Sequence, residues 1–230
     1  MSSSNIETRL ATLERELQRL KDVHEIEMLM GRHTVNHLMK NMARTLHFFA
    51  LDEPTVSIEV GDRGVYVGRK ALETLFQDQF GAAELKGNML FPFLTTPMIE
   101  IAGDGQSAKG TWRSPGVQSV MPKDGKGEPD PIWLFGAYAV DFIKKSGEWK
   151  ILHFHWYRLI KASHYQGWIK DQSWSFAGPL ENSPDLLPTT YHNPYTTEFT
   201  QDSIPGCPKP FETYDGPEWQ NKEQAEVWGM

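Results

Sequence analysis

Cysteine is almost absent from the sequence, and long apolar runs are absent altogether. The single cysteine among 230 residues, Cys207, excludes an internal disulfide framework and a zinc site built from several cysteines. No segment approaches the roughly 20 consecutive apolar residues that a transmembrane helix needs. The first residues, MSSSNIETRL, are polar and charged, unlike the apolar core of a secretory signal. We therefore expect a soluble, cytoplasmic protein with no membrane partner.

Positive charge is also scarce. The 23 Lys and Arg residues against 30 Asp and Glu residues give a formal net charge of −7, and the basic residues are scattered among acidic ones. Nucleic-acid binding relies on clustered Lys and Arg, so nucleic acid is excluded as the main partner. The sequence contains neither a GxGxxG fingerprint nor a Walker-type loop. We accordingly expect the protein to work without a cofactor.

What the sequence does contain is enough apolar material for one core, at 39% hydrophobic and 12% aromatic residues. The length suits one domain of ordinary size with extensions. The pattern divides the chain into an N-terminal amphipathic helix (1–20), an α+β domain (21–162) and a C-terminal extension rich in proline and aromatic residues (163–230).

The N-terminal helix has an apolar stripe with steps of four and three residues, which begins at Ile6 and ends at Leu20. This spacing resembles a short coiled-coil seam, and it is equally typical of an amphipathic helix that lies on its own domain. The helical pattern resumes after Gly31 and predicts helix to about Leu46.

Beyond Pro54 the pattern changes to mostly strands. The expected strands are 55–60, 65–67, 88–101, 107–114, 132–144 and 148–160, with one helix at 69–80 between the second and third. The tight turn KSG joins the last two strands, which is a strong hairpin signal. Helices first and strands afterwards predict an α+β fold with a curved antiparallel sheet. We expect the sheet to form a cone that the N-terminal helices wrap around a pocket.

The C-terminal extension has many prolines and no convincing periodicity between residues 174 and 219. Such a segment cannot build a core of its own, yet it is rich in Trp, Tyr and Phe. It either wraps across the domain or a neighbouring subunit, or it is simply disordered.

The last predicted strand, WKILHFHWYRLI (149–160), places two imidazoles in a run of apolar residues. Because side chains alternate in a strand, His153, His155 and Tyr157 share one side, which we expect to face the pocket. Buried imidazoles then need hydrogen-bond partners, a metal or a wet cavity. A β-bulge would reverse the alternation and send Phe154 and Trp156 inward instead.

A second pair of histidines, His33 and His37, lies four residues apart on the first helix. Side chains at this spacing stack on one face, about 6 Å apart at Cβ. They are either cavity residues or ordinary histidines at an interface or on the surface.

Four segments in order resemble the SnoaL-like family of the nuclear-transport-factor-2-like superfamily. They are DVHEIEMLMGRHTVNHLMKN (22–41), VGRKALETLF (67–76), IAGDGQSAKGTWRSPG (101–116) and WLFGAYAVDFIKKSGEWKILHFHWY (133–157). The resemblance covers roughly residues 20–160 and implies a cone-shaped α+β barrel with His33 facing its cavity. The family includes cyclases, dehydratases, isomerases, epoxide hydrolases and members that only bind ligands, so the fold alone does not decide the function.

The tail motif YHNPY (191–195) is similar to a subgroup associated with lignin-derived aromatics, which includes a formaldehyde lyase acting on diarylpropane diols. One departure from the family matters here. Dehydratase members place a Tyr and then an Asp on the first long helix, where this chain has His33 and His37. The Tyr/Asp/His constellation therefore cannot be transferred whole.

Our sequence-based prediction is a cofactor-independent lyase, dehydratase or isomerase acting on an apolar aromatic or polycyclic molecule. The predicted catalytic residues are His33, His153, His155, Tyr138 and Tyr157, because imidazoles titrate near 6.5 and can serve as both acid and base. The predicted substrate-binding residues are His37, Trp112, Arg113, Ser114, Trp133 and Phe91.

Three alternatives stay open: a metal enzyme that uses the four histidines, a ligand-binding protein without catalysis, and a structural assembly unit. We also expect a homodimer or homotrimer.

Overall fold

The structure, a computed structural model, describes residues 3–39, 41–76, 86–122, 124–179, 186–201 and 205–217. Its elements are α1 (Ser3–Leu38), α2 (Met42–Leu46), β1 (Ser57–Val60), β2 (Val65–Val67), α3 (Gly68–Thr74), β3 (Met89–Pro92), β4 (Thr95–Ile101), β5 (Ser107–Val120), β6 (Asp130–Lys145), β7 (Glu148–Ser163), α4 (Gly167–Lys170) and the 3-10 helix η2 (Ser173–Ser175). The element order agrees with the sequence-based prediction. The last residues of the helix expected at 69–80 lie outside the described part.

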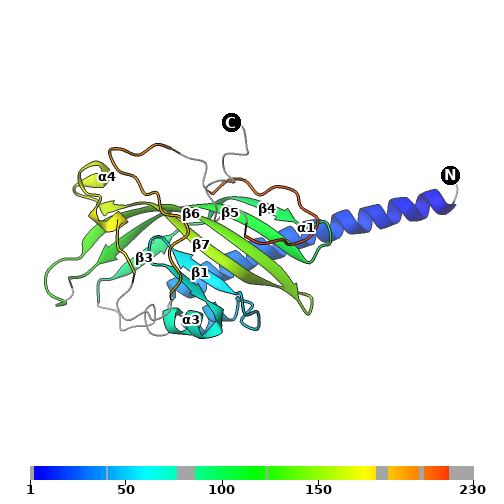
Figure 1. The fold of residues 1–230 in the computed structure, drawn as a ribbon, viewed down its shortest axis with the longest axis horizontal. Helices are drawn as coiled ribbons and strands as arrows, with labels where there is room; N and C mark the ends of the chain where they lie inside the picture. Colours follow the sequence, from blue (N-terminus) through cyan, green and yellow to red (C-terminus); the bar gives the residue numbers. More distant parts are fainter. Residues whose placement is uncertain are drawn as a thin grey trace.

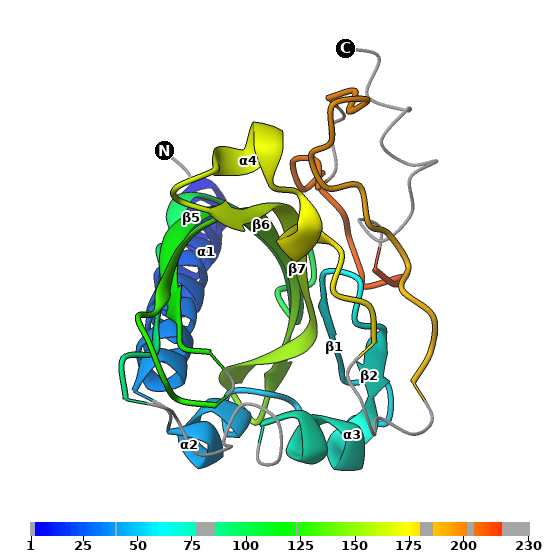
Figure 2. The same cartoon turned by 90° about the vertical axis from the view of Figure 1, so that its left-hand side faces the viewer.

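One strongly curved sheet dominates the fold (Figure 2). Its strand order is β2-β1-β7-β6-β5-β3, and β4 pairs with β5 beside β3. The pairs are antiparallel except β1 with β7, which is parallel. The predicted α+β fold with a curved sheet is thus confirmed, with one parallel pair that the sequence pattern did not indicate.

The hairpin between β6 and β7 follows directly from its turn residues. Ser146 has φ +51° and Gly147 has φ +86°, and two consecutive positive φ values are what the two-residue hairpin turns require. The long register between the two strands, from Ile132 opposite Ser163 to Lys145 opposite Glu148, builds the scaffold on which the site rests.

The core lies between α1 and the concave face of the sheet. Ile26 and Met30 of α1 are fully buried, as are Phe142 of β6 and Ile151 of β7. Burial of such apolar side chains stabilises the fold by about 1.5–3 kcal/mol each. In the described part of the chain, no helix is long and apolar enough to cross a membrane.

The first helix ends earlier than expected and continues as a second, short one. The side chain of Asn41 accepts a hydrogen bond from the backbone N–H of Arg44 and so caps α2, which is a typical helix start. At the other end, α1 extends beyond the sheet toward the N-terminus (Figure 1), and the described side chains of residues 5–18 are all exposed.

The described parts of the C-terminal extension follow the convex face of the sheet (Figures 1 and 2). Leu187 forms a β-bridge with Val65, and the backbone N–H of Tyr195 donates to Leu159. The hydroxyl of Tyr214 donates to Asp141 of β6 at 2.8 Å. These described segments therefore pack on their own domain.

Candidate functional site

A cavity of about 400 Å³ opens between the concave face of the sheet and the helices. Its lining combines apolar side chains with a few polar ones, as ligand pockets usually do. The apolar lining residues are Ile58, Val60, Phe76, Met89, Leu90, Pro92, Val120, Leu134, Phe154 and Trp156. The polar ones are His33, His37, Arg63, Asn88, Gln118, Ser119, Tyr138, Arg158 and Lys161.

The side of strand β7 that faces the cavity is the one that simple alternation predicts to face away from it. The β6–β7 register shifts by one residue at Leu152, because Asp141 pairs with His153 whereas Phe142 pairs with Ile151. A bulge of this kind reverses which side chains face the core. As a result Phe154 faces the cavity where His153 and His155 were expected.

A second shift occurs at Leu159, since Phe135 pairs with Ile160 and Gly136 pairs with Arg158. Between the two bulges, the inward side chains of β7 are Phe154, Trp156 and Arg158, and Lys161 joins them beyond the second. Gly136 makes room for this arrangement, because a Cβ there would lie 2.9 Å from the indole nitrogen of Trp156.

Three of the predicted site residues do line the cavity: His33, His37 and Tyr138. The two histidines stack with parallel rings at a centroid distance of 6.3 Å, as their spacing on the helix indicates. Two of the predicted substrate-binding residues, Trp112 and Ser114, are not among the lining residues. Trp112 packs against Phe142 in the core, and Ser114, on the same face of β5, is buried.

The orientation expected for His153, His155 and Tyr157 is wrong, because the bulge at Leu152 turns them to the convex face. The Nδ1 of His153 lies 2.8 Å from the hydroxyl of Ser57. The Nδ1 of His155 lies 3.4 Å from a carboxylate oxygen of Glu59, and its ring stacks on Tyr157 at 3.7 Å. Described parts of the C-terminal extension cover these residues.

Three of the predicted substrate-binding residues also lie outside the cavity. Arg113 follows Trp112 on β5 and therefore points to the convex face, where it lines a second cavity of about 300 Å³ with Tyr157. Trp133 alternates with Leu134 and stacks near Phe135 instead. Phe91, on β3, is 45% exposed and contacts Phe93, while its neighbours Leu90 and Pro92 line the cavity.

His33 is the most strongly perturbed group in the cavity. It is 6% exposed, and its ring lies 5.1 Å from Phe154 and 5.7 Å from Phe49. Burial, assisted by the neighbouring His37, lowers the pKa of His33 to about 3, because a charged imidazole is disfavoured away from water. Its Nε2 has no hydrogen-bond partner among the described residues. The ring is therefore neutral near pH 7, and this buried nitrogen has an unused hydrogen-bonding capacity.

Tyr138 supplies a phenol on the same side of the cavity. Its ring lies 5.1 Å from Phe154, the same phenylalanine that His33 contacts. Burial raises the pKa of Tyr138 to about 12, against the opposing effect of the Ser114 hydroxyl. The phenol therefore keeps its proton near neutrality and can donate a hydrogen bond.

The opposite end of the cavity contains three cationic side chains that our sequence reasoning missed. They are Arg63 from the turn between β1 and β2, and Arg158 and Lys161 from β7. Arg158 lies four residues beyond Phe154, the residue that His33 contacts, along a regular stretch of β7, which places their Cα atoms about 13 Å apart. If the two bulges had been included in the alternation of side chains, Arg158 and Lys161 would have been predicted to face the cavity, but the sequence gives no sign of where the bulges occur.

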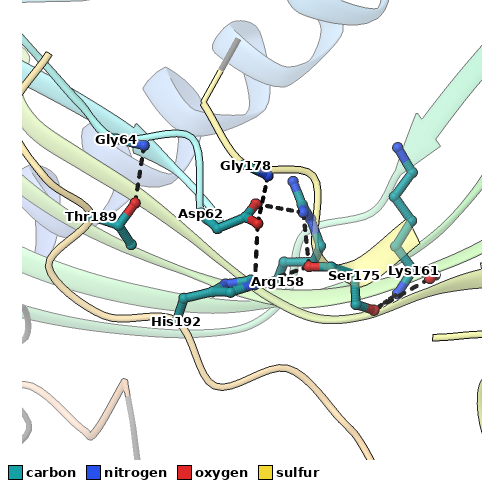
Figure 3. A network of polar contacts seen from close by, with 8 residues as sticks. All are labelled: Asp62, Gly64, Arg158, Lys161, Ser175, Gly178, Thr189 and His192. Carbon is teal, nitrogen blue, oxygen red and sulfur yellow. Dashed lines mark hydrogen bonds and ion pairs between the residues drawn. The ribbon is translucent and has the colours of Figure 1, made fainter. Parts of the chain in front are cut away.

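A polar network holds Arg158 in place (Figure 3). Its Nη1 donates to Asp62 at 2.9 Å and to the carbonyl of Ser175 at 3.0 Å. Asp62 also accepts from the backbone N–H of Gly178 at 2.7 Å. Gly61 leaves space for the guanidinium, because a Cβ there would lie 2.9 Å from its Cζ.

On the convex face, Glu59 and His155 form a buried pair beneath the C-terminal extension. Both are 1% exposed. Burial raises the pKa of Glu59 to about 7 although Thr190 donates two hydrogen bonds to its carboxylate. Burial, with His192 nearby, lowers the pKa of His155 to about 3. Near pH 7, His155 is therefore neutral, whereas Glu59 is close to the midpoint of its titration.

The four predicted histidines do not converge, since His33 and His37 are on the concave side of the sheet and His153 and His155 on the convex side. Within the described ranges, no three His, Cys, Asp or Glu side chains come together in a way that suits a metal ion. The arrangement needed for the metal-site alternative is thus absent from this part of the chain.

Comparison with known proteins identifies the fold and the family. A family model described as a SnoaL-like domain matches residues 18–155. No curated protein matches the sequence significantly.

Among solved structures, the hexachlorocyclohexane dehydrochlorinase LinA type 2 superposes with a TM-score of 0.54 at 13% identity, over 64% of this chain and 92% of the other. A scytalone-dehydratase-like protein from Novosphingobium aromaticivorans gives 0.51 at 16% identity, over 71% and 96%. LinA type 3 from Novosphingobium barchaimii gives 0.51 at 14% identity, over 64% and 93%. At these identities the similarity shows a shared fold and nothing about substrate.

Proposed function

This chain belongs to the SnoaL-like family, and on that premise we propose that it is a cofactor-independent lyase, dehydratase or isomerase acting on an apolar aromatic or polycyclic small molecule. The observation that carries the proposal is the buried, neutral His33 with a free Nε2 at one end of an apolar cavity. An imidazole in that state is already in its proton-accepting form, and its lowered pKa makes it a weaker base than an exposed imidazole.

The chemistry follows from the two groups near Phe154. The Nε2 of His33 takes a proton from a C–H or O–H group of the substrate, and the electron pair left behind forms a double bond as a C–O or C–C bond breaks. Tyr138 donates a hydrogen bond to the oxygen on which negative charge develops. The resulting imidazolium returns its proton to the leaving group or, in an isomerisation, to another carbon. Atoms and electrons balance without any oxidant or reductant.

The sequence-based pairing of His33 with His153 or His155 is not part of this proposal, because the sheet separates them. Tyr138 takes the second role instead. Release of formaldehyde from an aromatic diol is one form of the same chemistry. The base removes the proton of the hydroxymethyl group, its carbonyl forms as the C–C bond breaks, and the electron pair of that bond forms a carbon–carbon double bond as the second hydroxyl group leaves. The imidazolium returns its proton to that hydroxyl group, which departs as water. The tail motif YHNPY favours this form through its similarity to the lignin-related subgroup.

A panel of aromatic diols, hydroxy ketones and polycyclic hydroxy compounds, analysed by mass spectrometry and NMR, tests the proposal. We expect loss of water or formaldehyde, or isomerisation, for at least one class. His33→Gln should then lower kcat by 10²–10⁴-fold, which is the usual contribution of a positioned base. Tyr138→Phe should lower kcat with less effect on KM.

His24→Gln is the matched control for the loss of an imidazole, because His24 is exposed on the same helix. His153→Gln tests which face of the sheet carries the active site, because His153 lies on the convex face and His33 on the concave one. If His153→Gln abolishes turnover while His33→Gln does not, the cavity on the concave side is not the active site. If tight ligands are recovered unchanged at every pH tested, the protein is a binder and not a catalyst.

A further inference from the structure

One end of the cavity has an excess of positive charge, because its cationic side chains outnumber the described carboxylates around them. Arg63, Arg158 and Lys161 line the cavity, and no Asp or Glu of the described chain does so. Asp62 lies behind Arg158 and pairs with it. One carboxylate against three cations leaves an excess of two positive charges next to an apolar hollow.

The two guanidinium groups also have donors that the described residues do not satisfy. Arg158 is 4% exposed, and although its Nη1 is bonded twice, its Nε has no hydrogen-bond partner. The buried Nε of Arg63 also lacks one. An unsatisfied buried donor on a charged group costs about 1–3 kcal/mol or more, so a ligand acceptor at this end would be strongly favoured.

Lys161 adds a third cation that is turned away from the network around Arg158 (Figure 3). Its ammonium lies 5.3 Å from the ring centroid of Trp174. Burial, and then the nearby Arg158 and Arg63, lower the pKa of Lys161 to about 8. Crowded cations in a partly buried place repel one another, and a bound anion would relieve that repulsion.

We propose that this cationic end, formed by Arg63, Arg158 and Lys161, binds a carboxylate or comparable anionic group of the substrate. The substrate is then an amphiphilic molecule, with an anion at one end, an apolar body across Phe154 and Trp156, and the reacting atoms near His33. This inference rests on the proposed function because it names the substrate class of the same cavity. The separation of about 13 Å between the two ends favours an extended molecule over a compact one.

A pair of unreactive probes tests the inference: biphenyl-4-carboxylate and its neutral analogue biphenyl-4-carboxamide. Their affinities can be measured by isothermal titration calorimetry or through the intrinsic tryptophan fluorescence. We expect the carboxylate to bind at least tenfold more tightly than the amide. Equal affinities, or a preference for the amide, would overturn the inference.

Variants that replace one cation with a neutral side chain show which residues cause the preference for the carboxylate over the amide. Lys161→Gln and Arg63→Gln should each reduce the ratio of the two affinities at least threefold. Lys150→Gln is the matched control, because Lys150 is on the same strand but bonds to Glu148 and to the carbonyl of His47, outside the cavity. Circular dichroism checks that each variant is folded. A ratio that persists in both cavity variants would also contradict the inference.

The outcomes separate this inference from the proposed function. Carboxylate preference without turnover of any compound would support the anion site and refute the catalytic proposal. Turnover of neutral substrates without a preference for the carboxylate probe would support the catalytic proposal and refute the anion site.

A second inference concerns α1 and has an independent basis. The stripe on its N-terminal half is between 53% and 68% exposed at every apolar position, namely Ile6, Leu10, Leu13, Leu17 and Leu20. The described side chains of α1 begin to be buried at Arg19, where Arg19 bonds to Glu100 and buried Asp22 accepts from Lys144 and Trp149. Most helix stability in proteins comes from the packing of an apolar face, so a partner that covers the stripe would stabilise this half of α1.

The charges beside the stripe identify the partner as another copy of the chain. With Leu10 and Leu17 at a positions of a heptad, the flanking g positions include Arg9 and Glu16, and the e positions include Glu14 and Lys21. In a parallel coiled coil, each g residue faces the e residue five positions later on the neighbouring helix. Arg9 then faces Glu14 and Glu16 faces Lys21, so both pairs are attractive.

We infer that α1 forms a parallel coiled coil with α1 of a second copy of this chain. Light scattering at micromolar concentration should give a mass of at least two chains. Leu13→Asp should yield monomers, whereas Arg15→Glu, at an outward-facing position, should not. Glu16→Lys should weaken the association and Glu16→Lys with Lys21→Glu should restore it. A monomeric parent protein would refute the inference.

The direction of the helices can be tested with one cysteine. In a Cys207→Ser background, Ile6→Cys places like residues opposite each other in a parallel pair and should form an intermolecular disulfide on mild oxidation. In an antiparallel pair, a residue at a d position lies opposite an a position near the other end of the partner's stripe, so residue 6 is far from its own copy and no such bond forms. An oligomer without that disulfide would contradict the parallel arrangement.

Discussion

Replacement of His33 should make the protein less sensitive to acid. The pKa of His33 is lowered to about 3 by burial, against about 6.5 in the unfolded chain. Between these values the unfolded chain binds a proton that the folded chain does not, so acid favours unfolding. The contribution of neutral His33 to stability is therefore present above pH 6.5 and is lost as the pH falls from 6.5 toward 3.

The size of the effect follows from the shift. Each pKa unit corresponds to 1.36 kcal/mol, so a shift of about 3.5 units is worth about 5 kcal/mol over the whole window. Lowering the pH from 7 to 5 covers only the first part, and should cost the parent protein about 2 kcal/mol through His33 alone. His33→Gln removes the titrating group but keeps a polar side chain of similar size.

Urea unfolding of the two proteins at pH 7 and pH 5 measures this difference, since the free energy of unfolding extrapolates linearly with denaturant. The parent should lose about 2 kcal/mol more than His33→Gln between the two pH values. Both proteins retain His153 and His155, whose effects cancel in the comparison, and His24→Gln controls for the loss of an imidazole from α1. Parallel pH dependence in the parent and His33→Gln would show that His33 is not held neutral by burial.

Three further predictions use the same unfolding measurement. Gly61→Ala should destabilise by about 1–3 kcal/mol and by more than Gly105→Ala, because both positions have positive φ but only Gly61 has Arg158 within 2.9 Å of a new Cβ; equal costs would contradict that contact. Glu59→Gln should gain about 2 kcal/mol of unfolding free energy relative to the parent as the pH rises from 5 to 8. The reason is that the pKa of Glu59 is raised to about 7, so the stability that protonated Glu59 gives the parent is lost as the pH rises through 7. If the difference in unfolding free energy between the two proteins stays constant over this pH range, Glu59 is ionised throughout it. Phe154→Ala should cost about 3–5 kcal/mol, because Phe154 is 5% exposed; a cost under 1 kcal/mol would be inconsistent with its inward orientation.

The fold could be predicted because its signals are local and redundant. The hairpin turn at Ser146 and Gly147 and the order of the elements each indicate the same α+β architecture. The positions of His33 and His37 are equally secure, since a regular helix keeps its phase over many residues. Their spacing alone fixes their relative placement, and the packing of α1 on the sheet then places both in the cavity.

The site on β7 could not be predicted in the same way. A strand has a period of two, so one extra residue reverses every later side chain. The bulges at Leu152 and Leu159 do this twice, and no Gly or Pro in β7 marks either position. His153 and His155 were assigned to the wrong face for this reason alone. Arg158 and Lys161, which the same bulges direct to the cavity, were missed.

The separation of the two ends of the cavity explains how an anionic substrate and a neutral base can coexist. A full negative charge about 13 Å along β7 from Phe154, the residue that His33 contacts, changes the protonation energy of His33 by about 1 kcal/mol at an effective dielectric constant near 20. That is less than one pKa unit, whereas burial lowers the pKa of His33 from 6.5 to about 3. The cations that hold the anion reduce its effect further. His33 therefore stays neutral when the substrate binds, and the base is ready before the reacting atoms arrive.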